Sequence, residues 1–295
     1  MGTAQASSQI SPKNILFATD FSSCSEAALS FAFSIARRSG ARIFAVHVIS
    51  LSPFPNSPPT LVYQSLAAQA VREAQEAMNR LEPKWKGVPH ETLIRKGDIW
   101  RELSRIIEEK QIDLVVCGTH GRTGAAKVLM GSVSEAIYRH APCPVLTVGP
   151  RVAGAPESLG EIHSILCATD FTAESMSAAA YAVSFARENQ ARLYLLHVCE
   201  SPVSGAVKEE LFGRLRGLVP SGVELSCAPK AMVESGVPAE KITDLAEELM
   251  VDLIVLGPKR RAMLPGASHL PASTAHRVMS RAVCPVLTIR KRAGK

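Results

Sequence analysis

The chain has 295 residues, of which 46% are hydrophobic and 20% are charged, and its formal net charge is +6. This length suits two domains of about 150 residues, and the composition is that of a globular protein with a substantial core. No apolar run approaches the roughly 18 residues that cross a bilayer. Residues 1–12 also lack the apolar segment of a secretory signal, so we expect neither a membrane protein nor a secreted one.

The seven cysteines contain no Cys-x-x-Cys pair, so neither a zinc site nor a disulfide framework is indicated. Several of them lie inside apolar runs, which favours buried free thiols and a cytoplasmic location. The basic clusters Lys259–Arg261 and Arg290–Arg292 are the one feature that suggests a nucleic-acid surface. No aromatic residues interleave with them, so we expect a solvated face and tail there instead.

In the first half, short apolar runs alternate with helical patterns. We expect strands at Asn14–Thr19, Arg42–Val48, Glu91–Arg95, Leu114–Gly118 and Pro144–Val148, and helices at Ser25–Ser39, Leu61–Leu81, Ile99–Lys110 and Ser132–His140. Ser132 or Ser134 is available to cap the last of these helices. The strand patterns are continuously apolar rather than alternating, which favours a parallel sheet covered by helices on both faces.

The chain also contains an internal repeat. Four stretches of the first half return in the second: ILFATDF at 15–21 as ILCATDF at 165–171, ARIFAVHV at 41–48 as ARLYLLHV at 191–198, DLVVCG at 113–118 as DLIVLG at 252–257, and CPVLT at 143–147 as CPVLT at 284–288. Repetition of this kind indicates duplicated structural units.

We therefore predict an α/β fold with two repeated, doubly wound parallel five-stranded sheets. The first domain is expected at residues 13–149 and the second at 162–291, joined by a linker rich in proline and glycine. The fifth strands, Pro144–Val148 and Pro285–Ile289, should be sheet edges. Edges of this kind invite pairing, so the two domains are expected to pair through them as an internal pseudo-dimer, and a homodimer of the whole chain stays open.

The stretch Gly118–Ser134, GTHGRTGAAKVLMGSVS, links a strand end to a helix start. Its glycines allow backbone N–H groups to approach an anion closely, and the helix N-terminus adds partial positive charge. We therefore expect a phosphate group to bind there. The stretch lacks the lysine and hydroxyl of a Walker A loop. Arg122 and Lys127 either help to neutralise the phosphates or are exposed to solvent.

In a doubly wound sheet, ligands bind at the carboxyl ends of the strands, near the point where the strand order reverses. Asp20 follows the first strand, Val48 ends the second and Gly118 ends the fourth, so we expect them at one edge of the sheet. A single carboxylate suits a hydroxyl-bearing group such as a ribose, whereas it would repel phosphates.

The spacing Gly118-x2-Gly121-x9-Gly131-Ser132 resembles the ATP-binding motif of the universal stress protein family. The strand ends Ala18–Phe21 and His47-Val48 and the segment Ala141–Leu146 also resemble that family, and the plan repeats over Ser164–Ile289. The resemblance implies a tandem universal stress protein with a Rossmann-like, adenine-nucleotide-binding fold. It implies ATP, with or without magnesium, as the ligand, a protein partner that the sequence does not identify, and a nucleotide-dependent role in stress-response regulation.

The resemblance also implies a role for individual residues. The nucleoside end would be lined by Ala18, Thr19 and Asp20, and the backbone of Val48 would contact adenine. The phosphate turn would begin at Cys117 and Gly118, with N–H groups from Gly121 and Gly131 and with Ser132, Val133 and Ser134 holding the phosphates from the helix start, the two hydroxyls donating.

The second half departs from this pattern. Asp170, Val198, Gly257 and Ser273 remain, but Arg260 replaces the second glycine and Ala272 replaces the last one, after a spacer two residues longer. Three prolines, Pro258, Pro265 and Pro271, remove N–H donors. We therefore predict that this second site is weakened or lost. In the alternative, Arg260 and Arg261 meet phosphates directly with their side chains.

Catalysis is not expected. No Gly-x-Ser-x-Gly elbow is present, and no second acid or metal cluster accompanies Asp20. His120 is expected to shape the loop rather than to act as a catalyst, and His47 and His197 are expected to be structural. Two alternatives to an ATP-binding regulator stay open: a slow ATPase or phosphotransferase, and a nucleotide-free interaction module in which the glycines serve only packing.

Overall fold

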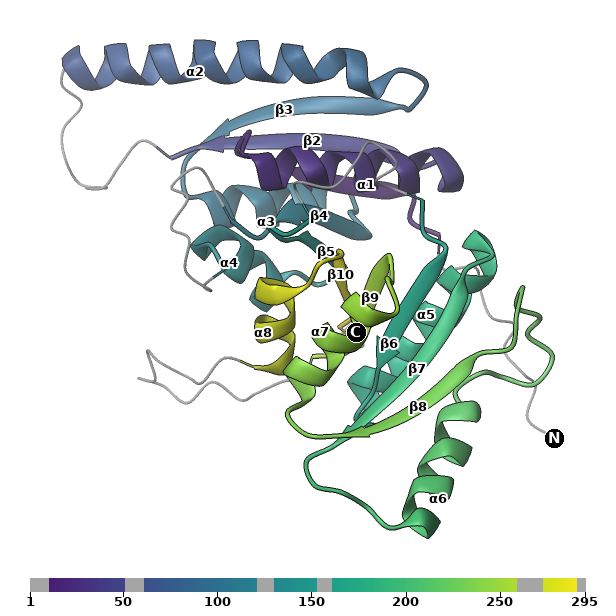
Figure 1. Ribbon diagram of the computed structural model, residues 1–295. Helices are drawn as coiled ribbons and strands as arrows, with labels where there is room; N and C mark the ends of the chain where they lie inside the picture. The colour runs from purple at the N-terminus through teal and green to yellow at the C-terminus, as the bar shows by residue number, and fades with distance from the viewer. Residues whose placement is uncertain (1–10, 51–60, 121–129, 153–160, 259–272, 291–295) are drawn as a thin grey trace.

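The structure is a computed structural model, and it describes residues 11–50, 61–120, 130–152, 161–258 and 273–290. Helices and strands alternate along the chain in both halves (Figure 1). The elements of the first half are β1 (Asn14–Ala18), α1 (Ser23–Ser39), β2 (Arg42–Ile49), α2 (Leu61–Leu81), the 3-10 helix η1 (Glu82–Trp85), β3 (His90–Lys96), α3 (Ile99–Glu109), β4 (Leu114–Gly118), α4 (Ser132–His140) and β5 (Val145–Val148). All nine predicted elements are present, with ends that differ by at most two residues.

The second half repeats this order. Its elements are β6 (Ser164–Ala168), α5 (Ala173–Asn189), β7 (Arg192–Cys199), α6 (Gly205–Arg216), β8 (Lys230–Ser235), α7 (Pro238–Glu248), β9 (Leu253–Leu256), α8 (Thr274–Arg281) and β10 (Val286–Thr288). No helix among the described residues is long and apolar enough to cross a membrane. The seven cysteines, all within the described residues, are free thiols, and five of them are buried.

The ten strands form one sheet in the order β3-β2-β1-β4-β5-β10-β9-β6-β7-β8. Neighbouring strands are parallel within each half. Strands β5 and β10 pair antiparallel, with Leu146 opposite Leu287. The predicted five-stranded parallel sheets and the predicted pairing of their fifth strands are therefore confirmed, and the two sheets continue into each other edge to edge.

Helices cover both faces of this sheet, because the side chains of each strand alternate between the faces. On one face, Ile15 and Phe17 of β1 belong to a core cluster that includes residues of α1, α2, α5 and α6 and runs through both halves. On the other face, Leu16 packs with residues of α3 and α4. A matching cluster around α7 and α8 covers that face in the second half.

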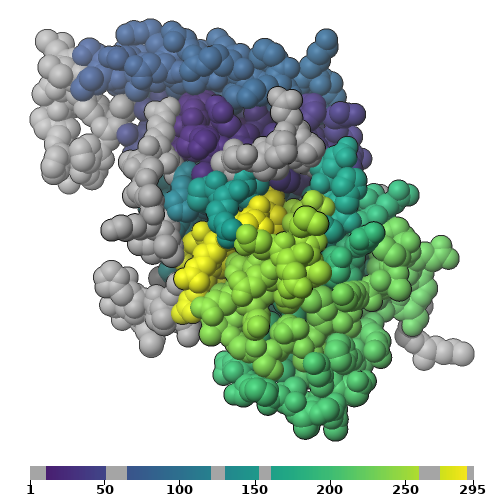
Figure 2. All heavy atoms as spheres, in the orientation of Figure 1, coloured from purple at the N-terminus to yellow at the C-terminus, as the bar shows by residue number. Residues whose placement is uncertain are grey.

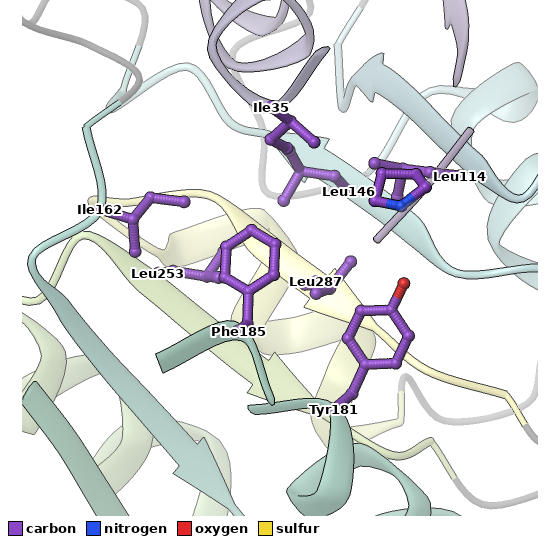
Figure 3. Close-up of a pocket in the computed structure, with 9 residues that line it drawn as sticks. Ile35, Leu114, Leu146, Ile162, Tyr181, Phe185, Leu253 and Leu287 are labelled. Atoms are coloured by element: carbon purple, nitrogen blue, oxygen red, sulfur yellow. The ribbon is translucent and has the colours of Figure 1, made fainter. Parts of the chain in front are cut away.

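The seam between the halves is a packed apolar core. Tyr181 and Phe185 of α5 lie close to Leu146 and Leu287 at the paired edges (Figure 3). The space left between these side chains is only about 10 Å³, roughly the volume that one water molecule requires. In the space-filling view, the green part of the second half lies against the first half (Figure 2).

Candidate functional site

A pocket of about 220 Å³ opens at the carboxyl ends of β1, β2 and β4. The strand order reverses between β1 and β4, so the pocket lies where a doubly wound sheet is expected to bind its ligand. Every described residue that the sequence predicted for the first site lines this pocket: Ala18, Thr19, Asp20, Val48, Cys117, Gly118, Gly131, Ser132, Val133 and Ser134. Gly121, Arg122 and Lys127 lie outside the described residues.

A tight turn after β1 places Asp20 at the pocket. The Thr19 hydroxyl accepts the Phe21 N–H (3.0 Å), and a carboxylate oxygen of Asp20 accepts the Ser22 N–H (3.0 Å). Phe21 adopts the left-handed region with φ 61°, which costs a residue with a Cβ about 1–2 kcal/mol. Phe171 repeats this conformation with φ 60°. The turn is therefore an unusual conformation that both halves retain.

His47 stabilises the same turn from β2. Its Nδ1 lies 2.8 Å from the Thr19 carbonyl oxygen, and its ring centroid lies 4.6 Å from that of Phe21. His197 makes the corresponding 2.8 Å contact with the Thr169 carbonyl oxygen. Both histidines are thus hydrogen-bonded near the sheet edge, as predicted, and His47 also lines the pocket.

Gly118 is required by the packing of helix α1 onto β4. A Cβ at this position would lie 2.9 Å from both the backbone carbonyl carbon of Cys24 and the backbone nitrogen of Ser25. At Gly257 a Cβ would lie 2.3 Å from the Glu174 carbonyl oxygen. Real Cβ atoms do not approach backbone this closely. These two glycines thus serve helix–strand contact in addition to any contact with a ligand.

Helix α4 begins at the pocket without a side-chain cap. Its N-cap residue is Gly131, so the prediction that Ser132 or Ser134 caps the helix is wrong. The Ser134 hydroxyl instead donates to the Gly118 carbonyl oxygen at 2.7 Å. The Gly131 N–H donates to the Thr119 carbonyl oxygen at 2.8 Å, rather than pointing to a phosphate as the family resemblance implied.

Because of these two hydrogen bonds, the Ser134 hydroxyl and the Gly131 N–H are not the donors to a phosphate that the sequence predicted. The N–H groups of Ser132, Val133 and Ser134 occupy the first turn of α4, where no intrahelical acceptor exists. The Ser132 side chain adds an exposed hydroxyl at the same place. The donor groups that remain at this end of the pocket are therefore the backbone N–H groups of these three residues and the Ser132 hydroxyl.

Cys117 and His120 also line the pocket. Burial raises the pKa of the Cys117 thiol to about 12, with a further contribution from Asp20, so this cysteine is a neutral packing group. One ring nitrogen of His120 lies 2.9 Å from the Thr119 hydroxyl, as expected for a histidine that shapes the turn. Among the described residues there is no group of three or more side chains that could hold a metal ion.

A second pocket of about 510 Å³ lies at the carboxyl ends of β6, β7 and β9. Asp170, Val198, Gly257 and Ser273 line it as the sequence predicted, whereas Arg260 lies outside the described residues. Ser273 caps helix α8 by accepting the His276 N–H at 3.2 Å. The start of α8 therefore differs from the uncapped start of α4.

Comparison with known proteins identifies the family to which this chain belongs. The model of the universal stress protein family matches residues 12–149 and, a second time, residues 161–290. The chain belongs to the universal stress protein family. A universal stress protein of Methanocaldococcus jannaschii is 34% identical over 139 residues, which are 46% of this chain and 81% of that protein. One from Mycolicibacterium smegmatis is also 34% identical over 139 residues, covering 46% of each chain.

The tandem arrangement has a counterpart among solved structures. A universal stress protein from Archaeoglobus fulgidus superposes with a TM-score of 0.69 over 94% of this chain and 98% of its own. At 22% identity this likeness shows the fold. It extends over both halves, as expected for a tandem universal stress protein.

The structure adds residues to the site of this universal stress protein that its glycine motif does not reveal. The apolar wall of the pocket is formed by Ile99 and Leu103 of α3 and by Ile137 of α4. The apolar stripe of α3 was visible in the sequence, but only the packing of α3 against β2 and α4 shows that part of this stripe also lines the pocket.

Proposed function

We propose that this universal stress protein binds ATP in the first-half pocket and acts in the cytoplasm as a nucleotide-dependent regulator of a stress response. The observation that carries the proposal is the convergence of three kinds of group in one 220 Å³ pocket: an apolar wall, a single carboxylate and an uncapped helix start. Each of them matches one chemical part of a nucleotide.

The pocket favours one orientation of the nucleotide. Val48, Ile99 and Leu103 supply apolar surface for the adenine ring. Asp20 would accept hydrogen bonds from the ribose hydroxyls, which a carboxylate attracts, and it would repel the phosphates. The phosphates then belong at the first turn of α4, where N–H donors and the helix dipole favour negative charge.

The proposed role is binding rather than efficient turnover. Asp20 is the one carboxylate among the described lining residues, and it already accepts the Ser22 N–H. A general base would need a second group to share the proton transfers of hydrolysis. Magnesium bound with the phosphates would neutralise their charge, and the residues described here would position the nucleoside and the helix-bound phosphate.

The direct test is to identify the nucleotide that the purified protein releases on denaturation, by chromatography and mass spectrometry. Gly131→Val is the matched variant. Gly131 has φ −60° and ψ 148°, an extended conformation that valine adopts without strain, so the variant should fold. We expect ATP from the wild type and none from the variant, because the valine side chain would occupy space at the lining of the pocket beside the first turn of α4. A wild-type protein that releases no nucleotide and binds no added ATP would overturn the proposal.

A nucleotide-free interaction module is the second candidate, because Gly118 and Gly257 are both required by packing against a helix. This candidate predicts that Gly131→Val leaves all partner binding unchanged.

A slow ATPase is the third candidate. It predicts steady release of ADP from added ATP and magnesium, at a rate that falls when Gly131→Val removes the bound nucleotide.

A further inference from the structure

The second pocket retains the nucleoside end of the first. A carboxylate oxygen of Asp170 accepts the Thr172 N–H at 3.1 Å, as Asp20 accepts the Ser22 N–H. The histidine of β7 again contacts the carbonyl oxygen that precedes the aspartate, at 2.8 Å. Val198 lines the second pocket as Val48 lines the first. A group that fits the aspartate and the valine of one half therefore meets the same two side chains in the other.

The apolar wall of the second pocket carries a smaller side chain at one position. Pro238 and Ile242, from the first two turns of α7, line it at the positions that Ile99 and Leu103 occupy in the first half. A proline ring reaches less far from the backbone than an isoleucine side chain, and the second pocket measures about 510 Å³ against about 220 Å³. The second pocket thus has room for a flat ring system.

The phosphate end is altered. The Ser273 hydroxyl accepts the His276 N–H (3.2 Å) and lies 3.3 Å from the Tyr138 hydroxyl of the other half. One donor of the helix start is therefore already bound by a protein oxygen. Thr274 brings a hydroxyl to this pocket where the first half has Val133, so the difference lies in the capped N–H group. The start of α8 offers a phosphate one N–H group fewer than the uncapped start of α4.

The residues that line the second pocket also include one more carboxylate than those of the first, which disfavours phosphate. Glu200, at the end of β7, joins Asp170 in the second pocket, and Arg277 is the one basic residue among the described lining residues. Ser50 is the counterpart of Glu200 in the first half. Two carboxylates repel the several negative charges of a nucleoside triphosphate, whereas they hydrogen-bond readily to hydroxyl groups.

We propose that the second pocket is a site for an uncharged purine nucleoside, with adenosine bound in preference to ATP. The purine identity rests on the proposed function, because it transfers the base from the first pocket through Asp170 and Val198. The discrimination against phosphate rests on Glu200, Asp170 and the capped start of α8. This protein would then hold two different ligands, a nucleotide in the first half and a nucleoside in the second.

Photolabelling of the full chain tests this assignment. The wild-type protein is irradiated with 8-azidoadenosine or with 8-azido-ATP, and the labelled peptides are located by mass spectrometry. We expect 8-azidoadenosine on peptides of residues 161–290 and 8-azido-ATP on peptides of residues 12–149. If 8-azidoadenosine labels no peptide of the second half, the inference fails. If 8-azido-ATP labels no peptide of the first half, the proposed function fails, and the labelled peptides tell the two failures apart.

Two substitutions that change the charge beside each pocket test the proposed preference of the second pocket for adenosine over ATP. Glu200→Lys should raise labelling of the second half by 8-azido-ATP on the order of tenfold and leave folding intact, because Glu200 is exposed. Ser50→Glu, the matched change, should lower 8-azido-ATP labelling of the first half and spare 8-azidoadenosine labelling of the second. Strong 8-azido-ATP labelling of the wild-type second half, through the basic residues 259–261, would overturn the inference.

Discussion

The hydroxyl of Ser134 donates a 2.7 Å hydrogen bond to the carbonyl oxygen of Gly118. The bond joins the first turn of α4 to the end of β4, the two elements that flank the glycine-rich stretch. Ser134 is 7% exposed, so the carbonyl group and the hydroxyl satisfy each other away from water. The position of the start of α4 is therefore set by the strand itself.

Ser134→Ala should consequently destabilise the protein by about 1–2 kcal/mol, because a largely buried carbonyl oxygen loses its donor. Ser132→Ala is the control two residues away. It removes an exposed hydroxyl that lines the pocket, so it should change the free energy of unfolding by less than about 0.5 kcal/mol and weaken ATP binding several-fold. Urea denaturation and ATP titration of both variants check this. Equal stability of the two variants would contradict the structural role of Ser134.

Gly118→Ala and Gly257→Ala should each lower stability by about 1–3 kcal/mol, because the new methyl group would enter the space of a helix backbone. The change at Gly257 should be the larger of the two, since its Cβ would lie 2.3 Å from backbone rather than 2.9 Å.

Gly213→Ala in α6 is the matched control for these two substitutions. No heavy atom lies within 4 Å of a Cβ built there, and alanine favours the helix over glycine by up to about 1 kcal/mol. Denaturant unfolding should therefore show a gain in stability for Gly213→Ala and losses for the other two. A loss of similar size in all three would refute the close-approach explanation.

The order of the elements could be predicted from the sequence because each strand and helix carries a local signal. Continuous apolar runs such as 114–118 predict buried parallel strands, and the repeat extends the prediction to the second half. The pairing of β5 with β10 was predictable for the same reason, since each fifth strand was expected at an edge.

The details of the site depend on distances between elements that are remote in sequence, and they were not predictable. Gly118 reads as a phosphate-binding glycine, but its need for a missing Cβ comes from Cys24, which lies 94 positions earlier in the chain. Ser134 reads as a helix cap or a phosphate donor, yet its partner is a strand carbonyl group. Local patterns do not encode either contact.

The seam between the halves should be a major source of stability. Leu146 and Leu287 are opposite each other in the β5–β10 pair and are 1% and 3% exposed. Substitution of either leucine by alanine should cost about 2–5 kcal/mol. Because the two side chains share one core (Figure 3), the double variant should depart from additivity by about 0.5–3 kcal/mol.

Leu66→Ala is the control for the seam, because Leu66 on α2 is 55% exposed. Its effect on the free energy of unfolding should stay within about 0.5 kcal/mol. Equilibrium denaturation of the four variants gives the coupling directly. Strict additivity of Leu146→Ala and Leu287→Ala would mean that the two edges are not packed as one core.

His276 should make stability depend on pH. Its Nδ1 is buried with no hydrogen-bond partner among the described residues. Burial lowers the pKa of His276, and Arg139 lowers it further, although Glu135 acts in the opposite direction. The unfolded chain, with an ordinary pKa of about 6.5, then binds the proton more tightly than the folded protein does.

The wild-type protein should therefore lose stability relative to His276→Gln as the pH falls below about 6.5, and the loss should grow until the pH reaches the lowered pKa. Above that range the difference between the two proteins should be constant. Urea unfolding of both proteins between neutral and acidic pH measures it. A difference that stays constant down through acidic pH would show that His276 titrates alike in both states.

The central claim is that one ATP binds per chain, in the first half. Isothermal titration calorimetry of the purified, nucleotide-free protein with ATP and magnesium tests it most directly, with Gly131→Val as the paired variant. We predict a stoichiometry of one for the wild type and no binding by Gly131→Val, with both proteins folded by circular dichroism. Binding of unchanged affinity and stoichiometry by Gly131→Val, or no binding by the wild type, would contradict the claim.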